Sequence, residues 1–550
     1  MMSAIVIIVS GIVAMFVALI GLETYSRYKL KRKVIDNWGK QPYQSHLDKE
    51  ESLNQAWQIE KGFRHWDSEV DELTWHDLDM FEIFKLINGT YSSVGSEALY
   101  QQLRNFNFAK DQELEDLIDF FEENPKMQQE IQYNYARLGK QDNNFTKQYL
   151  ASGQREQLGT FWLYVALGVL PIISLLLLLI IGPVALLLFI GAMVFNIIFY
   201  MYKKVRLEIE LNSMRYLVQT IVLTKKLCKL KTPLQAEMKQ NFQPLKGIAM
   251  WGFSFRIKGN TEADVLFDYL NMMFMIPFIA YNFVLTRLSK YNQQAINLWE
   301  ALGKMEVAIA VLNFRIYVPL SCQPQLKTGG VVAENIYHPL VNGPVANPVE
   351  WQKNILVTGS NASGKSTYVR SIAISAILAQ TINTALAESF TIQAGHVITS
   401  MAVEDNVIEG DSYFVAEIKS IKRLLDQVAT SQRCYCFVDE ILKGTNTIER
   451  IAASSSVVNW ISAYPSLAFV ATHDIELTEI LKTKCDNLHF EEQVTEEQGV
   501  NFDYQVRQGP ATTRNAIALL KVLGYPETLV KQAQSEAEYF DKHRTWTVFE

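Results

Sequence analysis

A glycine-rich loop that contains one lysine is the part of this sequence whose residue types most clearly suggest chemistry. The loop reads GSNASGKST and follows the apolar run Ile355–Thr358. It fits the phosphate-binding pattern GxxxxGK[ST] in the setting that this pattern requires, between a strand and a helix. Backbone N–H groups in the loop and the start of the helix at Tyr368 both favour phosphate oxygens. The predicted nucleotide-binding residues are Gly359, Ser360, Asn361, Ala362, Ser363, Gly364, Lys365, Ser366 and Thr367.

An acidic pair follows a second apolar run about 70 residues later. Phe437 and Val438 lead directly into Asp439 and Glu440. In a phosphate-binding site of this kind Lys365 neutralises the β- and γ-phosphates, and the Ser366 hydroxyl ligates Mg²⁺. Asp439 would complete the Mg²⁺ shell, and Glu440 would polarise the attacking water. Taken without the loop, the same pair would equally suit a solvated turn.

A histidine ends a third apolar run. Leu467–Ala471 is followed by Thr472 and His473. A histidine at the end of such a strand reaches the γ-phosphate, whereas a lone histidine is ordinarily a surface residue. We therefore predict ATP and Mg²⁺ as cofactors, with Glu440, His473 and Lys365 as the catalytic residues and Ser366 and Asp439 as the metal ligands.

These motifs, taken in order, resemble the ATPase domain of the MutS mismatch-repair family, a branch of the ABC-type ATPases. The family's TGPNMGGKST loop appears here as TGSNASGKST, its STFxxE segment as SYFVAE, its DExxxGTS as DEILKGTN, and its ATHxxEL as ATHDIEL. Residues 504–523, with Gly509-Pro510-Ala511, resemble the family's end segment, and Asn88–Leu99 resembles the start of its helical core. The resemblance is strong over about 215 residues and weaker over perhaps 250 more.

The resemblance implies a homodimer with composite ATP sites. In ABC-type ATPases a segment of one subunit closes the phosphate loop of the other, and the candidate here is Ser412. A serine just before a helix is also a common N-cap, a role that Asp411 would fill equally well. The end segment adds Tyr504 to the residues expected to bind the nucleotide.

The sequence also departs from the family. We find no N-terminal mismatch-reading domain and no Phe-x-Glu wedge, and the helical core is interrupted by apolar segments. The chain therefore looks like a membrane-bound, MutS-related branch. Three functions stay open: an ATPase dimer that acts on DNA, the same ATPase driving a membrane or envelope protein partner without DNA, and half of an ABC transporter. The last is disfavoured because the sequence lacks LSGGQ.

Three apolar segments are long enough to cross a bilayer. Ala4–Leu22 precedes five basic residues between positions 27 and 33, so it reads as an uncleaved anchor with its N-terminus outside. Phe161–Ile181 and Val184–Tyr200 form a predicted helical hairpin that turns at Gly182-Pro183, with basic residues beyond both outer ends. We expect a multi-pass protein of the cytoplasmic membrane with its ATPase domain in the cytoplasm. Met272–Val284 is a candidate core or interfacial helix, and a fourth span is the alternative.

The elements that position these motifs predict a mixed fold. We expect a transmembrane anchor (1–33), a helical core (34–157 and 205–332) interrupted by a transmembrane hairpin (158–204), and an α/β P-loop ABC-type ATPase domain (333–550). The net charge of −7 argues against a polycation built for nucleic acid, and the ATPase part holds 17 Lys and Arg against 26 Asp and Glu. The five cysteines include no CxxC pair, which argues against a disulfide framework or a zinc site. Cys434 and Cys436 alternate with aromatic residues, as in a buried strand.

Overall fold

The computed structural model divides the chain into two compact units. It describes residues 21–43, 45–62, 64–141, 146–147, 150, 161–255, 262–360, 363–401, 413–430, 432–495, 499–511, 517, 520–521 and 524–548. The first unit is Met1–His65, Lys85–Gln101 and Gln112–Tyr317, and the second is Trp66–Phe84, Gln102–Asp111 and Val318–Glu550. The predicted anchor Ala4–Leu22 lies outside the described residues, apart from its last two.

The first unit is helical. Its helices are α2 (Glu50–Lys61), α6 (Gln112–Glu123), α7 (Pro125–Leu138), α9 (Phe161–Leu176), α10 (Leu178–Ile181), α11 (Val184–Arg206), α12 (Glu208–Leu227), α13 (Gln235–Phe242), α14 (Lys246–Ala249), α15 (Glu262–Met273), α16 (Ile276–Lys290) and α17 (Asn292–Tyr317), with 3-10 turns at Gln243–Leu245 and Met250–Phe253. Helix α17 forms the centre of the core because Leu298, Leu302 and Met305 recur at helical spacing and are buried. Helices α4 (Met80–Ile87) and α5 (Ser93–Arg104) are shared in sequence between the two units.

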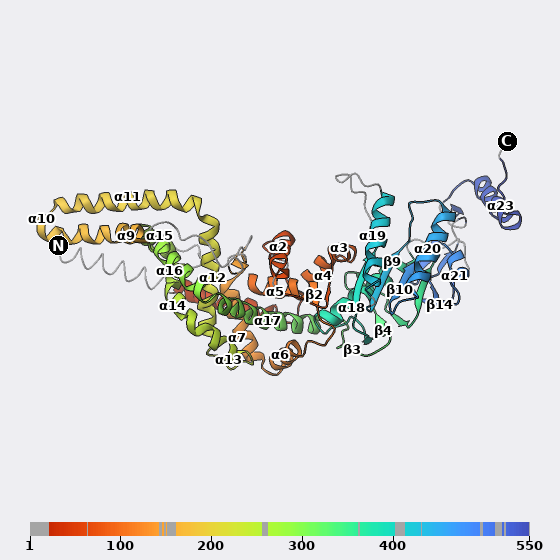
Figure 1. Cartoon of the computed structure of the whole chain (residues 1–550), viewed down its shortest axis with the longest axis horizontal. Helices are drawn as coiled ribbons and strands as arrows, with labels where there is room; N and C mark the ends of the chain where they lie inside the picture. Colours follow the sequence, from red (N-terminus) through yellow and green to blue (C-terminus); the bar gives the residue numbers. More distant parts are fainter. Residues whose placement is uncertain are drawn as a thin grey trace. The chain divides into compact units, whose positions relative to one another are not determined.

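The predicted apolar hairpin is a pair of helices that lie side by side (Figure 1). The chain turns at Gly182, whose φ of 64° suits a glycine, and α11 starts directly after Pro183. Phe161–Ile181 and Val184–Val205 are long and apolar enough to cross a membrane, and each is only 22% buried over its most apolar stretch.

The segment Met272–Val284 is not the single helix that we predicted. It is broken between α15 and α16, where Met275 has a left-handed φ of 53° and Pro277 occupies the first turn of α16. Most of α16 up to Leu288 is buried, which agrees with its prediction as a core element.

The second unit is built on a six-stranded sheet with the order β14-β11-β6-β10-β9-β8. Its strands are β6 (Asn354–Thr358), β8 (His396–Ser400), β9 (Cys434–Asp439), β10 (Leu467–Ala471), β11 (Cys485–His489) and β14 (Arg507–Gln508). All neighbours pair in parallel except β14, which is antiparallel to β11. The three predicted strands are present, and Cys434 and Cys436 are fully buried in β9 as expected.

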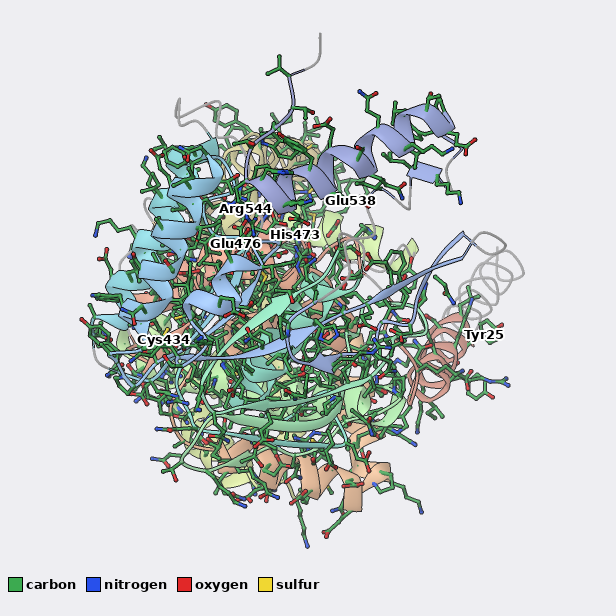
Figure 2. The ribbon with its side chains drawn as sticks, turned by 90° about the vertical axis from the view of Figure 1, so that its right-hand side faces the viewer. Tyr25, Cys434, His473, Glu476, Glu538 and Arg544 are labelled. Atoms are coloured by element: carbon green, nitrogen blue, oxygen red, sulfur yellow. The ribbon has the colours of Figure 1, made fainter. Side chains whose placement is uncertain are left out.

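Helices cover this sheet, as Figure 1 shows for α18 to α21. They are α18 (Lys365–Thr381), α19 (Tyr413–Val428), α20 (Thr447–Ile461) and α21 (Glu476–Ile480). Helix α23 (Glu527–His543) buries only Val530, and Figure 2 shows it, with Glu538, at the margin of the unit. A second sheet has the order β3-β7-β4-β5, formed by Gln325–Leu326, Ser389–Ile392, Val331–Ile336 and Asn347–Trp351. Strands β12 (Glu492–Thr495) and β13 (Gly499–Phe502) pair separately.

Two short segments from early in the chain complete the second unit. Strands β1 (Ser68–Glu69) and β2 (Asn105–Phe106) pair with each other, and α3 (Glu72–Asp77) packs against β8. The buried carboxylate of Asp77 accepts hydrogen bonds from the Thr399 hydroxyl at 2.6 Å and from the Met401 N–H at 2.9 Å. These bonds fix the carboxyl end of β8, next to the cavity described below.

Candidate functional site

A cavity of about 650 Å³ lies where the carboxyl ends of β6, β9 and β10 meet. Parallel α/β sheets place their ligands at this edge, because the loops that follow the strands converge there. The cavity is lined by Ile336, His338, Val341, Asn342, Gly343, Pro344, Val345, Asn347, Ser360, Ser363, Gly364, Lys365, Ser366, Thr367, Tyr368, Ser371, Met401, Asp439, Glu440, Lys443, His473, Phe490 and Tyr504. Its volume suits a nucleotide-sized ligand.

The glycine-rich loop leaves β6 and enters α18. Gly359 and Gly364 have φ values of 146° and 103°, which disfavour any other residue, and α18 begins directly after Gly364. The Lys365 ammonium donates to the carbonyls of Gly359 and Ser360, both at 2.7 Å. Burial lowers the pKa of Lys365 to about 8, against the opposing effect of nearby carboxylates. Asn361 and Ala362 lie outside the described residues.

The loop has features that fit a phosphate group. The Ser363 hydroxyl is buried and has no hydrogen-bond partner among the described residues. The Ser360 hydroxyl is held by the carboxylate of Glu492 at 2.7 Å. An orphaned donor in a loop at the start of a 17-residue helix is the arrangement that binds a phosphate oxygen.

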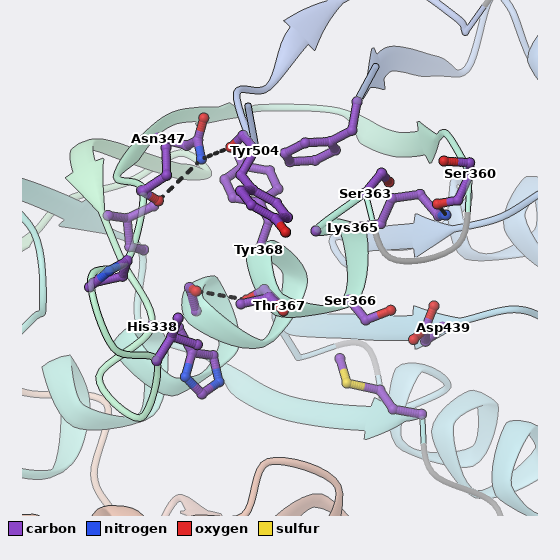
Figure 3. Close-up of a pocket in the computed structure, with 18 of the residues that line it drawn as sticks. His338, Asn347, Ser360, Ser363, Lys365, Ser366, Thr367, Tyr368, Asp439 and Tyr504 are labelled. Carbon is purple, nitrogen blue, oxygen red and sulfur yellow. Dashed lines mark hydrogen bonds between the residues drawn. The ribbon is translucent and has the colours of Figure 1, made fainter. Parts of the chain in front are cut away.

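Ser366 and Asp439 face one another across the cavity floor (Figure 3). Ser366 belongs to the first turn of α18, and Asp439 is the last residue of β9. A hydroxyl and a carboxylate are hard oxygen ligands, and Mg²⁺ ordinarily takes only one or two protein ligands besides phosphate and water. The two side chains therefore fit the predicted magnesium site.

Glu440 follows Asp439 in a left-handed conformation, with a φ of 59°. Its backbone N–H donates to the Ala471 carbonyl at 2.9 Å, which ties the end of β9 to the end of β10. One carboxylate oxygen lies 3.0 Å from Nε2 of His473, and the other lies 2.8 Å from the Lys443 ammonium. The hydrogen bond with His473, followed by that with Lys443, lowers the pKa of Glu440 to about 2.

A second carboxylate holds the loop that carries Glu440. Glu417, in the first turns of α19, is 4% exposed and accepts the backbone N–H groups of Lys443 and Gly444, both at 3.0 Å. Leu442 in this loop also has a left-handed φ, of 55°. Such conformations persist only where neighbouring contacts impose them, so the two bonds from Glu417 position Glu440.

Aromatic and amide groups line the cavity beside the glycine-rich loop. Tyr504 lines it, and a Cβ atom on Gly364 would lie 3.1 Å from the Tyr504 ring. The Asn347 carboxamide donates to the Tyr504 carbonyl at 2.9 Å and accepts from the Val506 N–H at 2.8 Å, which fixes this segment. Burial, followed by the charge of Arg370, lowers the pKa of His338 to about 4, so its ring is neutral at pH 7.

Comparison with known proteins identifies this part of the chain. The family model of MutS domain V matches residues 355–541. The DNA mismatch repair protein MutS of Natronomonas pharaonis is 29% identical over 223 residues, which are 38% of this chain and 26% of that protein. The protein of the same name from Lactococcus lactis subsp. cremoris is 33% identical over 183 residues, 32% of this chain and 21% of that protein. The chain is MutS-related. It matches only about a quarter of the length of these relatives.

In this MutS-related chain the structure brings most of the predicted site residues to one cavity. They are Ser360, Ser363, Gly364, Lys365, Ser366, Thr367, Asp439, Glu440, His473 and Tyr504. Gly359 precedes them, and its carbonyl accepts a hydrogen bond from Lys365 at 2.7 Å. Ser412 and Asp411 lie outside the described residues, so their role stays a prediction.

Three residues of the MutS-related site were not singled out in the sequence. Glu417 was noted only as the last residue of the SYFVAE segment, and its two partners lie 26 and 27 residues further along the chain. His338 and Asn347 precede the loop and belong to no local motif. For His338, the one feature of the sequence that could have suggested a site residue is its position before a proline near the start of the α/β region.

Proposed function

We propose that this chain is an ATP hydrolase of the MutS type, anchored in the membrane and active as a dimer. The observation that carries the proposal is the convergence of Lys365, Ser366, Asp439, Glu440 and His473 on one cavity at the carboxyl edge of a parallel sheet. The match of residues 355–541 to MutS domain V supports it.

Some residues of the cavity bind ATP, and others take part in its hydrolysis. Lys365 and the N–H groups at the start of α18 bind the β- and γ-phosphates, while Tyr504, whose ring lies against Gly364, contacts the nucleotide beside the loop. Ser366 and Asp439 hold Mg²⁺, which supplies positive charge to the phosphate oxygens. Glu440 stays ionised at neutral pH and orients the attacking water, and His473, at 3.0 Å from it, lies where it can contact the γ-phosphate.

A pair of substitutions tests the hydrolytic assignment. Glu440→Gln keeps the size of the side chain but loses the carboxylate, so it should retain ATP binding and lose nearly all turnover. Lys365→Ala should weaken ATP binding itself. Turnover at the wild-type rate in Glu440→Gln would show that another group positions the water.

We propose that each ATP site is completed by a second copy of the chain. Ser412 supplies its hydroxyl to the γ-phosphate bound by the partner. Helix α19 follows this segment, and its first turns expose Phe414, Val415 and Ile418, at 36%, 38% and 43%. Exposed apolar side chains at this point support a contact surface for another chain.

A mixing experiment tests the shared site. Lys365→Ala and Ser412→Arg chains should each be inactive, and a mixed dimer should contain one intact site and one doubly broken site. Partial recovery of ATPase activity on mixing is expected. Absence of recovery, with mixed dimers demonstrated by differently tagged chains, would mean that each chain carries its own complete site.

We propose that α9 and α11 cross the cytoplasmic membrane as a hairpin, with the ATPase domain in the cytoplasm. No Asp, Glu, Lys, Arg or His occurs between Phe161 and Tyr202, and Lys203, Lys204 and Arg206 follow, which supports a cytoplasmic end there. A cysteine introduced at Gly182 should react with an impermeant reagent added from the outside only. Reaction from the cytoplasmic side alone would reverse this orientation.

The object of the ATP-driven motion is proposed to be DNA, because both relatives compared above are named DNA mismatch repair proteins. The alternative, a membrane or envelope protein partner, is favoured by the acidity of the ATPase part, with 17 basic against 26 acidic residues from Ala333 onward. DNA binding by the detergent-solubilised dimer, measured over a series of salt concentrations, separates the two. A phosphate-contacting protein loses affinity steeply as salt rises.

A further inference from the structure

One side chain joins the apolar hairpin to the break between α15 and α16. Pro171 lies inside α9 and has no N–H, so the carbonyl of Leu167, four residues earlier, lacks its usual partner within the helix. The carboxamide nitrogen of Asn196 in α11 donates to this carbonyl at 2.7 Å. The same nitrogen donates to the carbonyl of Met273, the last residue of α15, at 2.8 Å. Asn196 therefore connects α9, α11 and α15.

The corner between α15 and α16, residues 273–278, also packs directly on the hairpin. A Cβ atom on Gly168 of α9 would lie only 2.4 Å from the carbonyl oxygen of Phe274, so the two backbones touch. The ring of Phe278 lies between those of Tyr164 and Tyr200, with centroid distances of 5.0 and 4.9 Å. The α15–α16 corner is thus part of the same packed bundle as α9 and α11.

These contacts lie well inside the apolar length of the hairpin. Gly168 is seven residues beyond the start of α9, and Asn196 is six residues before Tyr202, after which the basic residues of α11 begin. At about 1.5 Å per residue these positions are about 10 and 9 Å inside the apolar length. A hydrocarbon core is about 30 Å thick, so in a spanning hairpin the corner would reach into its cytoplasmic half.

The corner has the composition that such a position requires. No Asp, Glu, Lys, Arg or His occurs from Tyr269 to Thr286, and Asp268 and Arg287 bound this stretch. Tyr269 and Leu270 are 56% and 39% exposed on α15. Non-helical backbone inside a bilayer needs protein partners for its polar groups, and Asn196 provides one for Met273.

We propose that the α15–α16 corner is a re-entrant element of the membrane domain. It enters the cytoplasmic leaflet beside α9 and α11, contacts lipid acyl chains through Tyr269 and Leu270, and returns to the side from which it came. This inference rests on the proposed membrane hairpin and extends it, since α15 and α16 are each too short to span a bilayer.

Spin labels at three positions test the inference in the full chain reconstituted into phospholipid vesicles. Leu270→Cys reports the last turn of α15, next to the corner. Leu187→Cys, at a 72% exposed position of α11, reports the hairpin, and Gln240→Cys reports the exposed face of α13. Of the native cysteines only Cys322 is not buried, so replacing it by serine leaves the introduced residue as the reactive one. Collision with oxygen, which concentrates in lipid, is compared with collision with a water-soluble nickel chelate.

The labels at 270 and 187 should both relax faster with oxygen than with the chelate, and the label at 240 should show the opposite. If the label at 270 favours the chelate, or is shielded from both reagents, while the label at 187 favours oxygen, the re-entrant element is refuted and the hairpin stands. If the label at 187 itself favours the chelate, the membrane hairpin fails, and the inference fails with it.

Discussion

Removal of the Glu417 carboxylate should slow ATP hydrolysis without weakening ATP binding. The side chain holds the N–H groups of Lys443 and Gly444, in the loop where Glu440 and Leu442 have left-handed backbones. Without these bonds the loop is expected to relax away from its strained conformation. Glu440 would then spend less time in the position that orients water, whereas the phosphate loop, which makes no contact with Glu417 in the hydrogen bonds described above, should keep its shape.

The size of the effect follows from the two bonds. A hydrogen bond to a charged group contributes about 1.5–3 kcal/mol, and an N–H left without a partner costs less when water reaches it. Lys443 and Gly444 are exposed, so water will replace part of the lost interaction. We expect about 2–3 kcal/mol for the pair. Since each 1.36 kcal/mol is a factor of ten in rate, kcat of Glu417→Ala should fall by about 30- to 150-fold.

Steady-state ATPase assays and titration with a fluorescent ATP analogue measure the two quantities separately. Glu417→Gln keeps one acceptor oxygen and should give an intermediate kcat. Asp426→Asn, on the same helix, removes only an exposed pair with Lys422 and serves as the matched control. A wild-type kcat in Glu417→Ala, or an equal loss in kcat and in ATP affinity, would refute the positioning role.

Three further predictions concern other parts of the structure. Burial lowers the pKa of Lys365 to about 8, so its protonated fraction, and with it the affinity for ATP, should fall as the pH rises through 8. ATP binding at pH 8–9 should therefore take up protons, which calorimetry in buffers of different ionisation enthalpy detects. This proton uptake should vanish in Lys365→Ala. Asp77→Ala removes two buried hydrogen bonds and should lower the free energy of unfolding by about 3 kcal/mol, measured as a reduced melting temperature. Asp77→Asn should cause a smaller loss. Asn196→Leu leaves the Leu167 and Met273 carbonyls unpaired and should lower resistance to unfolding in SDS by about 1–2 kcal/mol, while Leu187→Ala, at an exposed position, should not.

The sequence predicted the parts of the site that are local in the chain. A glycine-rich loop, an acidic pair and a histidine each follow an apolar run directly, so the strand and its functional residue appear together in the sequence. Parallel pairing of β6, β9 and β10 then brings the three strand ends to one edge. Because parallel strands align their carboxyl ends at one edge of a sheet, the three motifs could be predicted to share one site.

The contacts that the sequence did not predict join distant residues. Asp77 and Thr399 are 322 residues apart, and no local pattern connects α3 with β8. The break at Met275 was missed because an apolar run with helical spacing gives no sign of a left-handed residue, and Pro277 two positions later was the one available signal. The hydrogen bond from Asn196 to the Leu167 carbonyl depends on a proline 25 residues away on another helix.

Helix α19 offers a physical route between the two halves of the proposed shared ATP site. Its N-terminal end follows the segment that contains Ser412, and its first turns carry Glu417, which holds the loop of Glu440. Further along, the Ser420 hydroxyl bonds to that of Ser400 at 2.8 Å, and Arg423 bonds to the Thr399 carbonyl, so the helix is also fastened to β8. A displacement of the start of α19 by the partner's nucleotide would therefore act on Glu440 through one rigid helix and two hydrogen bonds. Because the left-handed backbone at Glu440 and Leu442 persists only where neighbouring contacts impose it, a shift of Glu417 would change the position of Glu440.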